Sequence, residues 1–281
     1  MVRRSVLFSP ADQPDLLRKA PATGADVVVF DLEDGVLPAQ KATARDTLRS
    51  VLGEIDPECE LCVRINPLDS GGDADLDAIL PERATVDSIM LPKVSGPEQV
   101  RRLREQLPAD DSFPVLAVLE TAGGILDAPA IAAEDAVDAL LLGAEDLAAD
   151  IGATRTAAGE EVSYARQRVV LAASDAGIDA IDTLVTDFED TEQLRSDTRR
   201  AVQFGFDGKM AIHPRQVGLI NEIFVPDAEE IEWARRVLAA REESGDRGVF
   251  AVDGEMIDAP LLSQAEQILE RAGATTDDEQ S

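Results

Sequence analysis

The chain alternates short apolar segments with longer segments in which apolar residues recur every three to four positions. The short segments have between four and seven residues, and several, such as Val27–Phe30 and Leu140–Leu142, contain apolar runs. Strands of a parallel sheet are buried on both faces and have this continuous pattern. The pattern predicts eight strands, at Ser5–Ser9, Asp26–Leu32, Leu61–Asn66, Ser88–Pro92, Val115–Glu120, Ala139–Gly143, Ala180–Thr186 and Lys209–Ile212.

The longer segments predict amphipathic helices between these strands, among them Pro38–Leu52, Pro97–Leu107, Glu160–Ala176 and Thr191–Phe204. Eight strand–helix units in about 215 residues predict an α/β protein with a (β/α)₈ TIM barrel. A doubly wound open sheet is the alternative fold. It typically has fewer strands, and no G-x-G-x-x-G motif follows the first predicted strand.

A C-terminal helical extension follows the eighth unit. We expect residues 1–224 to form the barrel, 225–272 the extension and 273–281 a disordered polar tail. Within the extension, helices are predicted at Asp227–Glu243 and Ala259–Arg271. Because a barrel is closed without such a segment, we expect the extension to cover the barrel mouth or to pack on a neighbouring subunit.

The charge changes the picture of the surface. The 281 residues include 56 acidic and 26 basic residues, which gives a formal net charge of −30. Such a surface repels nucleic acid and anionic membranes, so we expect neither as a partner. Molar salt shortens the Debye length to about 3 Å and removes most of the self-repulsion. Since Lys19, Lys41, Lys93 and Lys209 are the only lysines, we expect a protein adapted to a high-salt cytoplasm, as in haloarchaea.

Two further features restrict the class of protein. No apolar run approaches the roughly 20 residues that span a membrane, and the N-terminal apolar run is too short for a signal peptide, so we expect a cytoplasmic protein. Cys59 and Cys62 have C-x-x-C spacing, but residues three apart on a strand face opposite ways. With no second pair, we expect free thiols rather than a zinc site or a disulfide.

Barrel active sites form where the strands end, and polar residues end each predicted strand. They include Glu33, Arg64, Lys93, Glu120, Asp146 and Lys209. Clustered carboxylates raise one another's pKa unless a cation neutralises them. Oxygen ligands with free coordination positions suit Mg²⁺, with Mn²⁺ as the second choice.

These strand ends predict specific roles. Glu120 and Asp146 end adjacent strands, so we expect them to hold the metal. Arg64 is expected to bind a carboxylate or keto oxygen in bidentate fashion, and Glu33, Lys93 and Lys209 are further expected substrate contacts. The alternative is structural: an acid after a strand is often a helix cap, and Lys93 could pair with such an acid.

The chain resembles the citrate lyase β-subunit-like branch of the HpcH/HpaI aldolase superfamily, the malyl-CoA and citramalyl-CoA lyase type. The resemblance covers residues 5 to about 270 and rests on eight segments in order. These are Leu7–Pro10, Phe30–Val36, Val63–Asn66, Leu91–Lys93, Glu120–Gly124, Gly143–Leu147, Gly208–Pro214 and Gly254–Asp258.

The resemblance implies a Mg²⁺-dependent lyase that cleaves a 3-hydroxyacyl-CoA, such as malyl-CoA, methylmalyl-CoA or citramalyl-CoA. The products would be an α-keto acid and acetyl- or propionyl-CoA. It implies Mg²⁺ on Glu120 and Asp146, a substrate oxygen on Arg64, and Asp258 as the acid/base in a neighbouring subunit of a homotrimer or hexamer. Relatives carry a Pro-Gly-Asn-like turn where this chain has Pro10-Ala11-Asp12. Arg18 and Lys19 are therefore the expected partners of the CoA phosphates.

Four alternatives stay open at this stage. The same site could hydrolyse malyl-CoA as a thioesterase, or the chain could be a citrate lyase β subunit that acts on a carrier-protein thioester. An aldolase for free hydroxy-keto acids is disfavoured by the extension and the Asp258 motif. A non-catalytic scaffold is disfavoured by the presence of Glu120, Asp146 and Arg64.

Overall fold

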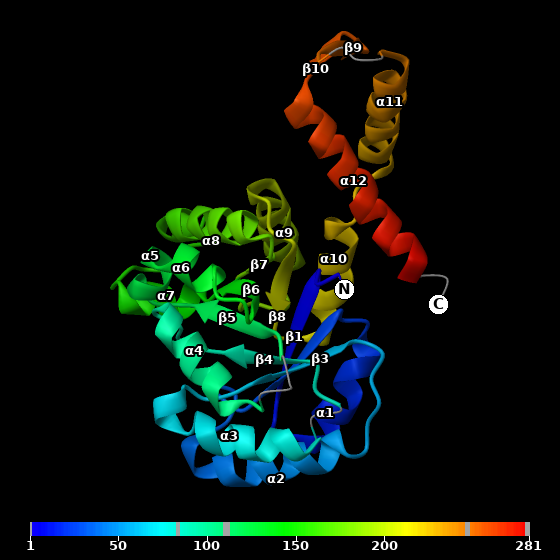
Figure 1. Cartoon of the computed structure of the whole chain (residues 1–281). Helices are drawn as coiled ribbons and strands as arrows, with labels where there is room; N and C mark the ends of the chain where they lie inside the picture. The colour runs from blue at the N-terminus through cyan, green and yellow to red at the C-terminus, as the bar shows by residue number, and fades with distance from the viewer. Residues whose placement is uncertain (1, 83–84, 109–112, 245–247, 279–281) are drawn as a thin grey trace. The chain divides into compact units, whose positions relative to one another are not determined.

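In the computed structural model, eight parallel strands close into a barrel, which confirms the predicted fold class (Figure 1). The structure describes residues 2–82, 85–108, 113–244 and 248–278. Neighbouring strands pair in sequence order, and β8 pairs with β1 to complete the ring. The strands are β1 Ser5–Pro10, β2 Val27–Asp31, β3 Glu60–Arg64, β4 Ser88–Leu91, β5 Val115–Leu119, β6 Val137–Leu142, β7 Asp179–Asp182 and β8 Gly208–Ala211.

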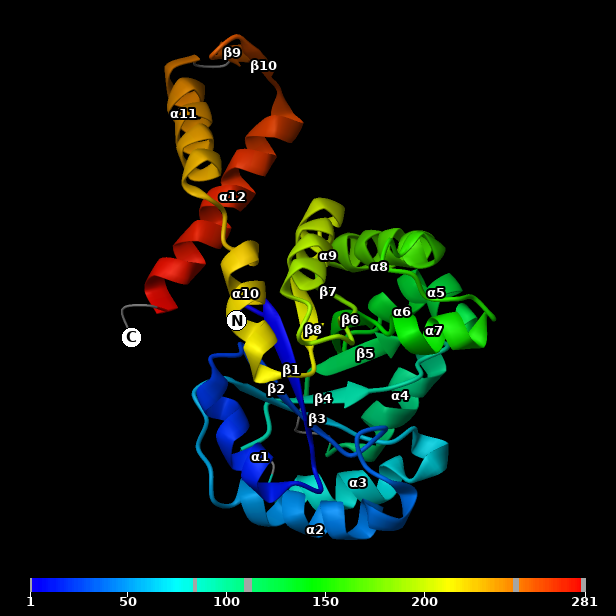
Figure 2. The same ribbon diagram turned by 180° about the vertical axis from the view of Figure 1, so that it is seen from behind.

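Helices follow the strands and lie outside the ring, as the views in Figures 1 and 2 show for α2, α3, α8 and α9. Short 3₁₀ turns join several of them, at Ala20–Thr23, Pro38–Gln40, Leu68–Ser70, Leu80–Glu82 and Glu160–Val162. The helices of the barrel unit are α1 Pro14–Lys19, α2 Lys41–Leu52, α3 Gly72–Ile79, α4 Pro97–Gln106, α5 Ala122–Leu126, α6 Ala128–Ala132, α7 Ala144–Asp150, α8 Ser163–Ala176, α9 Thr191–Phe204 and α10 Pro214–Phe224.

The barrel interior is filled by apolar side chains from alternate strand positions. On β2, Val27 and Val29 belong to the interior cluster, together with Leu116, Leu141 and other residues. Their neighbours on β2 are equally buried but, by the two-residue period of a strand, face the helices. Burial on both faces explains why this strand is a continuous apolar run in the sequence.

An ion network around the buried side chain of Arg3 lies at the N-terminal end of the barrel. Its guanidinium contacts Glu60 at 2.6 Å, Asp138 at 2.6 Å and Asp179 at 2.9 Å, three acids from different strands. The Ser88 hydroxyl donates to Glu60 at 2.6 Å. These ion pairs lie at the end of the barrel opposite the predicted site.

The chain divides into two compact units, residues 1–221 and 222–281, close to the predicted boundary after residue 224. The second unit contains α11 Ala228–Ser244, the antiparallel strands β9 Phe250–Val252 and β10 Glu255–Ile257, and α12 Ala259–Asp278. Its own apolar core includes Ala234, Val237 and Ile257. Asp253 and Gly254, with φ of 50° and 86°, form the two-residue turn of the hairpin.

Two expectations about element bounds and one about a cysteine need correction. Strand β7 ends at Asp182 rather than at Thr186. Helix α12 continues to Asp278 and so includes most of the segment that was expected to be a disordered tail. A single glycine, Gly273, costs a helix about 1 kcal/mol, which is not enough to end it. Residues 279–281 lie outside the described part. Cys62 is a buried free thiol of the barrel core, as expected, but Cys59 is only half-buried. Within the described ranges, no helix is long and apolar enough to cross a membrane.

The barrel core gives a test of the packing. Leu141 is 0 % exposed in the interior cluster, and we expect Leu141→Ala to lower the free energy of unfolding by about 2–5 kcal/mol, because the truncation leaves a cavity. Leu171→Ala, on the exposed face of α8, is the matched control; we expect a change within about 0.5 kcal/mol. Urea denaturation followed by circular dichroism measures both. Equal effects of the two substitutions would contradict this description of the core.

Candidate active site at the barrel mouth

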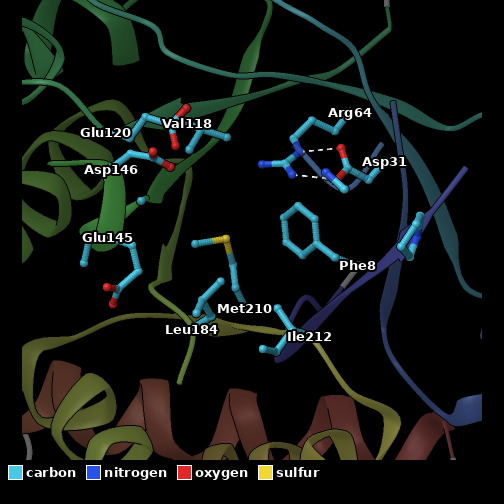
Figure 3. A pocket seen from close by; sticks show the side chains of 14 residues that line it. Phe8, Asp31, Arg64, Val118, Glu120, Glu145, Asp146, Leu184, Met210 and Ile212 are labelled. Atoms are coloured by element: carbon cyan, nitrogen blue, oxygen red, sulfur yellow. Dashed lines mark hydrogen bonds and ion pairs between the residues drawn. The ribbon is translucent and has the colours of Figure 1, made fainter. Parts of the chain in front are cut away.

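A cavity of about 240 Å³ opens where the strands end. Its apolar wall includes Phe8, Val118, Leu184 and Met210, and its polar residues are Asp31, Arg64, Glu120, Glu145 and Asp146 (Figure 3). In Figure 3 the side chains of Glu120 and Asp146 lie together on one side, and the guanidinium of Arg64 points toward them from the other. The structure thus brings together three residues that the sequence singled out.

Glu120 follows β5 directly and is held in one orientation. Its side chain is buried, and Oε1 accepts the backbone N–H of Lys93 at 2.7 Å. A β-carbon on Gly143 would lie 2.6 Å from both Cβ and Oε2 of Glu120, so only glycine fits there. Burial and then the charge of Asp146 raise the pKa of Glu120 to about 7. A carboxyl with this pKa ionises fully near neutrality only if a cation compensates it.

Asp146 is exposed to the cavity from the first turn of α7. Among the described residues, no side chain or backbone group forms a hydrogen bond or ion pair with its carboxylate, and no group of three His, Cys, Asp or Glu side chains converges. The site therefore offers two carboxylates, of which Asp146 is free to take a ligand.

Arg64 is held by a bidentate pair with Asp31, its register partner on β2. Both bonds are 2.7 Å long, and the guanidinium lies 4.9 Å from the ring centroid of Phe8. Asp31 is fixed in turn, because it accepts the backbone N–H groups of Glu33 and Gly35, each at 2.8 Å. Asp31 was not predicted as a site residue, although it is the last residue of β2.

Glu33 and Lys93 form an ion pair beside the cavity rather than in its lining. The Lys93 ammonium contacts Glu33 and, at 3.3 Å, Asp34, and Nη1 of Arg64 lies 3.3 Å from Glu33. Burial raises the pKa of Glu33, although the charges of Arg64 and Lys93 oppose this. Lys93 has a φ of 54°, a left-handed conformation that is costly for a residue with a side chain and that accompanies its N–H bond to Glu120.

Lys209 is not brought to the cavity. It is 0 % exposed, and its ammonium contacts Asp182, Asp197 and the carbonyl oxygen of Thr183. Its neighbour Met210 faces the barrel interior and lines the cavity, so Lys209 faces the surrounding helices. The expected substrate contact is therefore replaced by a buried ion cluster.

The remaining expected residues lie elsewhere in the described chain. Arg18 is paired with Glu54 at 2.9 Å on the exposed face of α1, and Lys19 is exposed at the end of that helix. Asp258 belongs to the second unit, where its backbone oxygen accepts the N–H of Leu262 at 3.0 Å and its carboxylate accepts that of Leu261 at 3.4 Å. It is thus the N-cap of α12, directly after β10.

The comparison with known proteins decides the family. The HpcH/HpaI aldolase/citrate lyase family matches residues 4–214, three quarters of the chain. The chain belongs to this family.

Relatives in the HpcH/HpaI family carry the names of enzymes. The mitochondrial citramalyl-CoA lyase of Mus musculus is 37 % identical over 95 % of this chain and 85 % of its own length. The (3S)-malyl-CoA thioesterase of Cereibacter sphaeroides is 35 % identical over 96 % of this chain and 95 % of its own. A crystal structure of protein CitE from Mycobacterium tuberculosis, in complex with magnesium, acetoacetate and coenzyme A, has a TM-score of 0.82 and 41 % identity. It covers 97 % of this chain, and 98 % of that chain is matched.

The support of Arg64 can be tested at Gly35. A β-carbon there would lie 2.4 Å from Oδ2 of Asp31, so Gly35→Ala must displace the carboxylate that holds Arg64. We expect a loss of stability of about 1–3 kcal/mol, as for other overpacked sites. Gly218→Ala in α10 is the control, because nothing lies within 4 Å of that β-carbon and alanine favours a helix. Urea denaturation that ranks Gly218→Ala as the more destabilising would contradict the geometry.

The effect of Asp146 on the pKa of Glu120 can be tested by NMR titration. In protein free of divalent cations, one glutamate carboxyl should titrate near pH 7, and Glu120→Gln should remove that signal. Asp146→Asn should move the midpoint to lower pH, because it removes the like charge that favours the protonated form. Carboxyl ¹³C NMR of glutamate-labelled protein measures this. A midpoint that does not move in Asp146→Asn would show that burial alone sets the pKa.

Proposed function

We propose that the protein is a Mg²⁺-dependent lyase that cleaves the carbon–carbon bond of a 3-hydroxyacyl-CoA bearing a carboxylate. The candidates are malyl-CoA, methylmalyl-CoA and citramalyl-CoA. The observation that carries the proposal is the pair Glu120 and Asp146 facing Arg64 across one cavity. The names of the relatives, which include a citramalyl-CoA lyase, support the same reaction class.

The residues present fit a magnesium ion, with Mn²⁺ as a substitute. Mg²⁺ is typically bound by one or two carboxylates and completes its shell with water and substrate oxygens. Glu120 and Asp146 offer such a pair, and a divalent cation would stabilise the ionised form of Glu120, which burial and then the charge of Asp146 disfavour. When bound, the ion supplies a Lewis acid that stabilises negative charge on the substrate's hydroxyl oxygen.

Residues of the chain itself would bind the substrate and transfer a proton. Arg64, kept rigid by Asp31, would bind the substrate carboxylate and the oxygen that becomes the keto group. Glu33 and Lys93 would contribute the neighbouring charges around Arg64. A base such as a water molecule would take the hydroxyl proton, and the oxygen would become the keto oxygen as the carbon–carbon bond breaks. The electron pair of that bond would pass to the thioester enolate, whose α-carbon would take up a proton from Asp258. The products are an α-keto acid and acetyl- or propionyl-CoA.

We assign Asp258 to the site of a neighbouring subunit in a homo-oligomer, a trimer or hexamer. Asp258 lies directly after the β9–β10 hairpin, in a compact unit that has its own apolar core. This position suits a residue that acts in the site of another subunit. Lys19 is a candidate contact for the CoA phosphates because it is exposed. Arg18 can join it, since an exposed ion pair such as Arg18–Glu54 contributes little and exchanges easily.

Thioester hydrolysis is the second candidate function. A malyl-CoA thioesterase is among the relatives and spans nearly the same length. The two reactions need the same charges and differ in whether a water molecule reaches the thioester carbonyl. They are distinguished by their products rather than by the residues of the site.

The test is incubation with malyl-CoA or citramalyl-CoA, Mg²⁺ and about 3 M KCl, a concentration chosen for near-complete screening. We expect glyoxylate or pyruvate together with acetyl-CoA, and loss of both with EDTA or in Asp146→Ala. Malate or citramalate plus free CoA, without keto acid, would identify a thioesterase. Turnover of a carrier-protein thioester alone would identify a citrate lyase β subunit.

The role of Asp258 needs its own variants. Asp258→Asn should bind Mg²⁺ normally but lose turnover, whereas Asp146→Asn should lose both. Co-expression of these two inactive chains should restore part of the activity, because some sites then combine an intact metal pair with an intact Asp258. Absence of restored activity in proven mixed oligomers would contradict action between subunits.

A further inference from the structure

A buried charge cluster lies between strands β7 and β8 and helices α8 and α9. Arg166 contacts Asp182 in bidentate fashion at 3.0 Å and Asp197 at 2.8 Å. Lys209 contacts the same two carboxylates at 3.1 and 2.6 Å. Two cations thus balance two anions. Buried ion pairs are a weak source of stability compared with apolar packing, so the groups that this cluster orients matter more than the stability it adds.

The cluster reaches the active site through Thr183. Strand β7 ends at Asp182, so Thr183 lies beyond the last strand residue, and the Lys209 ammonium donates to its carbonyl oxygen at 2.5 Å. The hydroxyl of Thr183 accepts the backbone N–H of Ala144 at 3.2 Å. Ala144 lines the cavity and is the first residue of α7, two residues before Asp146.

Helix α7 has no N-cap side chain of its own. The residue before it is Gly143, and its glycine is required because a β-carbon would collide with Glu120. The first N–H groups of a helix need external acceptors, and this position has no side chain to supply one. Thr183, which is 1 % exposed, provides the oxygen from the neighbouring strand. With seven residues, α7 is too short to hold its orientation without such contacts.

We propose that Thr183 is a positioning residue for Asp146, and that Lys209 holds Thr183 in place. The hydroxyl fixes the start of α7 so that the carboxylate of Asp146 meets that of Glu120. The inference rests on the proposed function, in which these two carboxylates hold the metal. It also gives Lys209 a role at the site without contact to substrate.

The experiment measures Mn²⁺ binding to the full-length protein by electron paramagnetic resonance, in the absence of substrate. Thr183→Val keeps the shape of the side chain but removes the acceptor. We expect its dissociation constant for Mn²⁺ to rise about tenfold, the lower end of the effect of losing a group that orients a metal ligand. Thr183→Ser keeps the hydroxyl and should bind Mn²⁺ like the wild type. Thr183→Ala, which cannot overpack the site, should match Thr183→Val and serves if the valine variant does not fold.

Each outcome decides between roles. Weaker Mn²⁺ binding in both variants without the hydroxyl, rescued by serine, supports the positioning role. Unchanged Mn²⁺ binding with a lower melting temperature would overturn it and leave Thr183 as a structural residue, while the proposed function stands. A wild-type protein that binds no Mn²⁺ would overturn the proposed function as well, so the two failures are distinguished by the wild-type measurement.

Discussion

The burial of Glu120 beside the carboxylate of Asp146 is the constraint on which the rest of the site depends. Burial and then the charge of Asp146 raise the pKa of Glu120 to about 7, and within the described ranges no side chain neutralises the two carboxylates by a direct ion pair. Arg64, which faces them across the cavity, is paired with Asp31, and the side chain of Lys93 is paired with Glu33. The negative charge is thus kept available for an external cation. Arg64, already paired, is kept oriented for an anionic ligand.

The placement of these carboxylates constrains the backbone at specific positions. Gly143 has no side chain because Glu120 occupies that space, and Lys93 adopts a left-handed conformation while its N–H reaches Glu120. Gly35 is equally constrained by Asp31. These three positions follow the alternate strands β2, β4 and β6, and a strained backbone conformation such as that of Lys93 is typical of functional sites. Here each of them is explained by the placement of one particular carboxylate.

The sequence predicted the eight strands because burial on both faces gives continuous apolar runs, as in β2. It located Glu120, Asp146 and Arg64 because barrel sites form where strands end. It did not predict the partners of these residues, since Asp31 meets Arg64 only through the strand register. It placed Lys209 wrongly because a four-residue strand, Gly208–Ala211, is too short for its alternation to indicate which face is interior.

Three of the four lysines now have a common physical explanation. Lys41 donates to the carbonyl oxygens of Leu32 and Glu33 and to Asn66, Lys93 contacts Glu33 and Asp34, and Lys209 contacts two aspartates and the Thr183 carbonyl. An ammonium group has three donors on one compact charge, whereas a guanidinium is a planar fork that matches one carboxylate best. A lysine is therefore suited to gathering several oxygens of a loop at one point. In a chain whose basic residues are mostly arginine, these lysines hold the loops that follow β2, β4 and β7, and these loops support Arg64, Glu120 and Asp146.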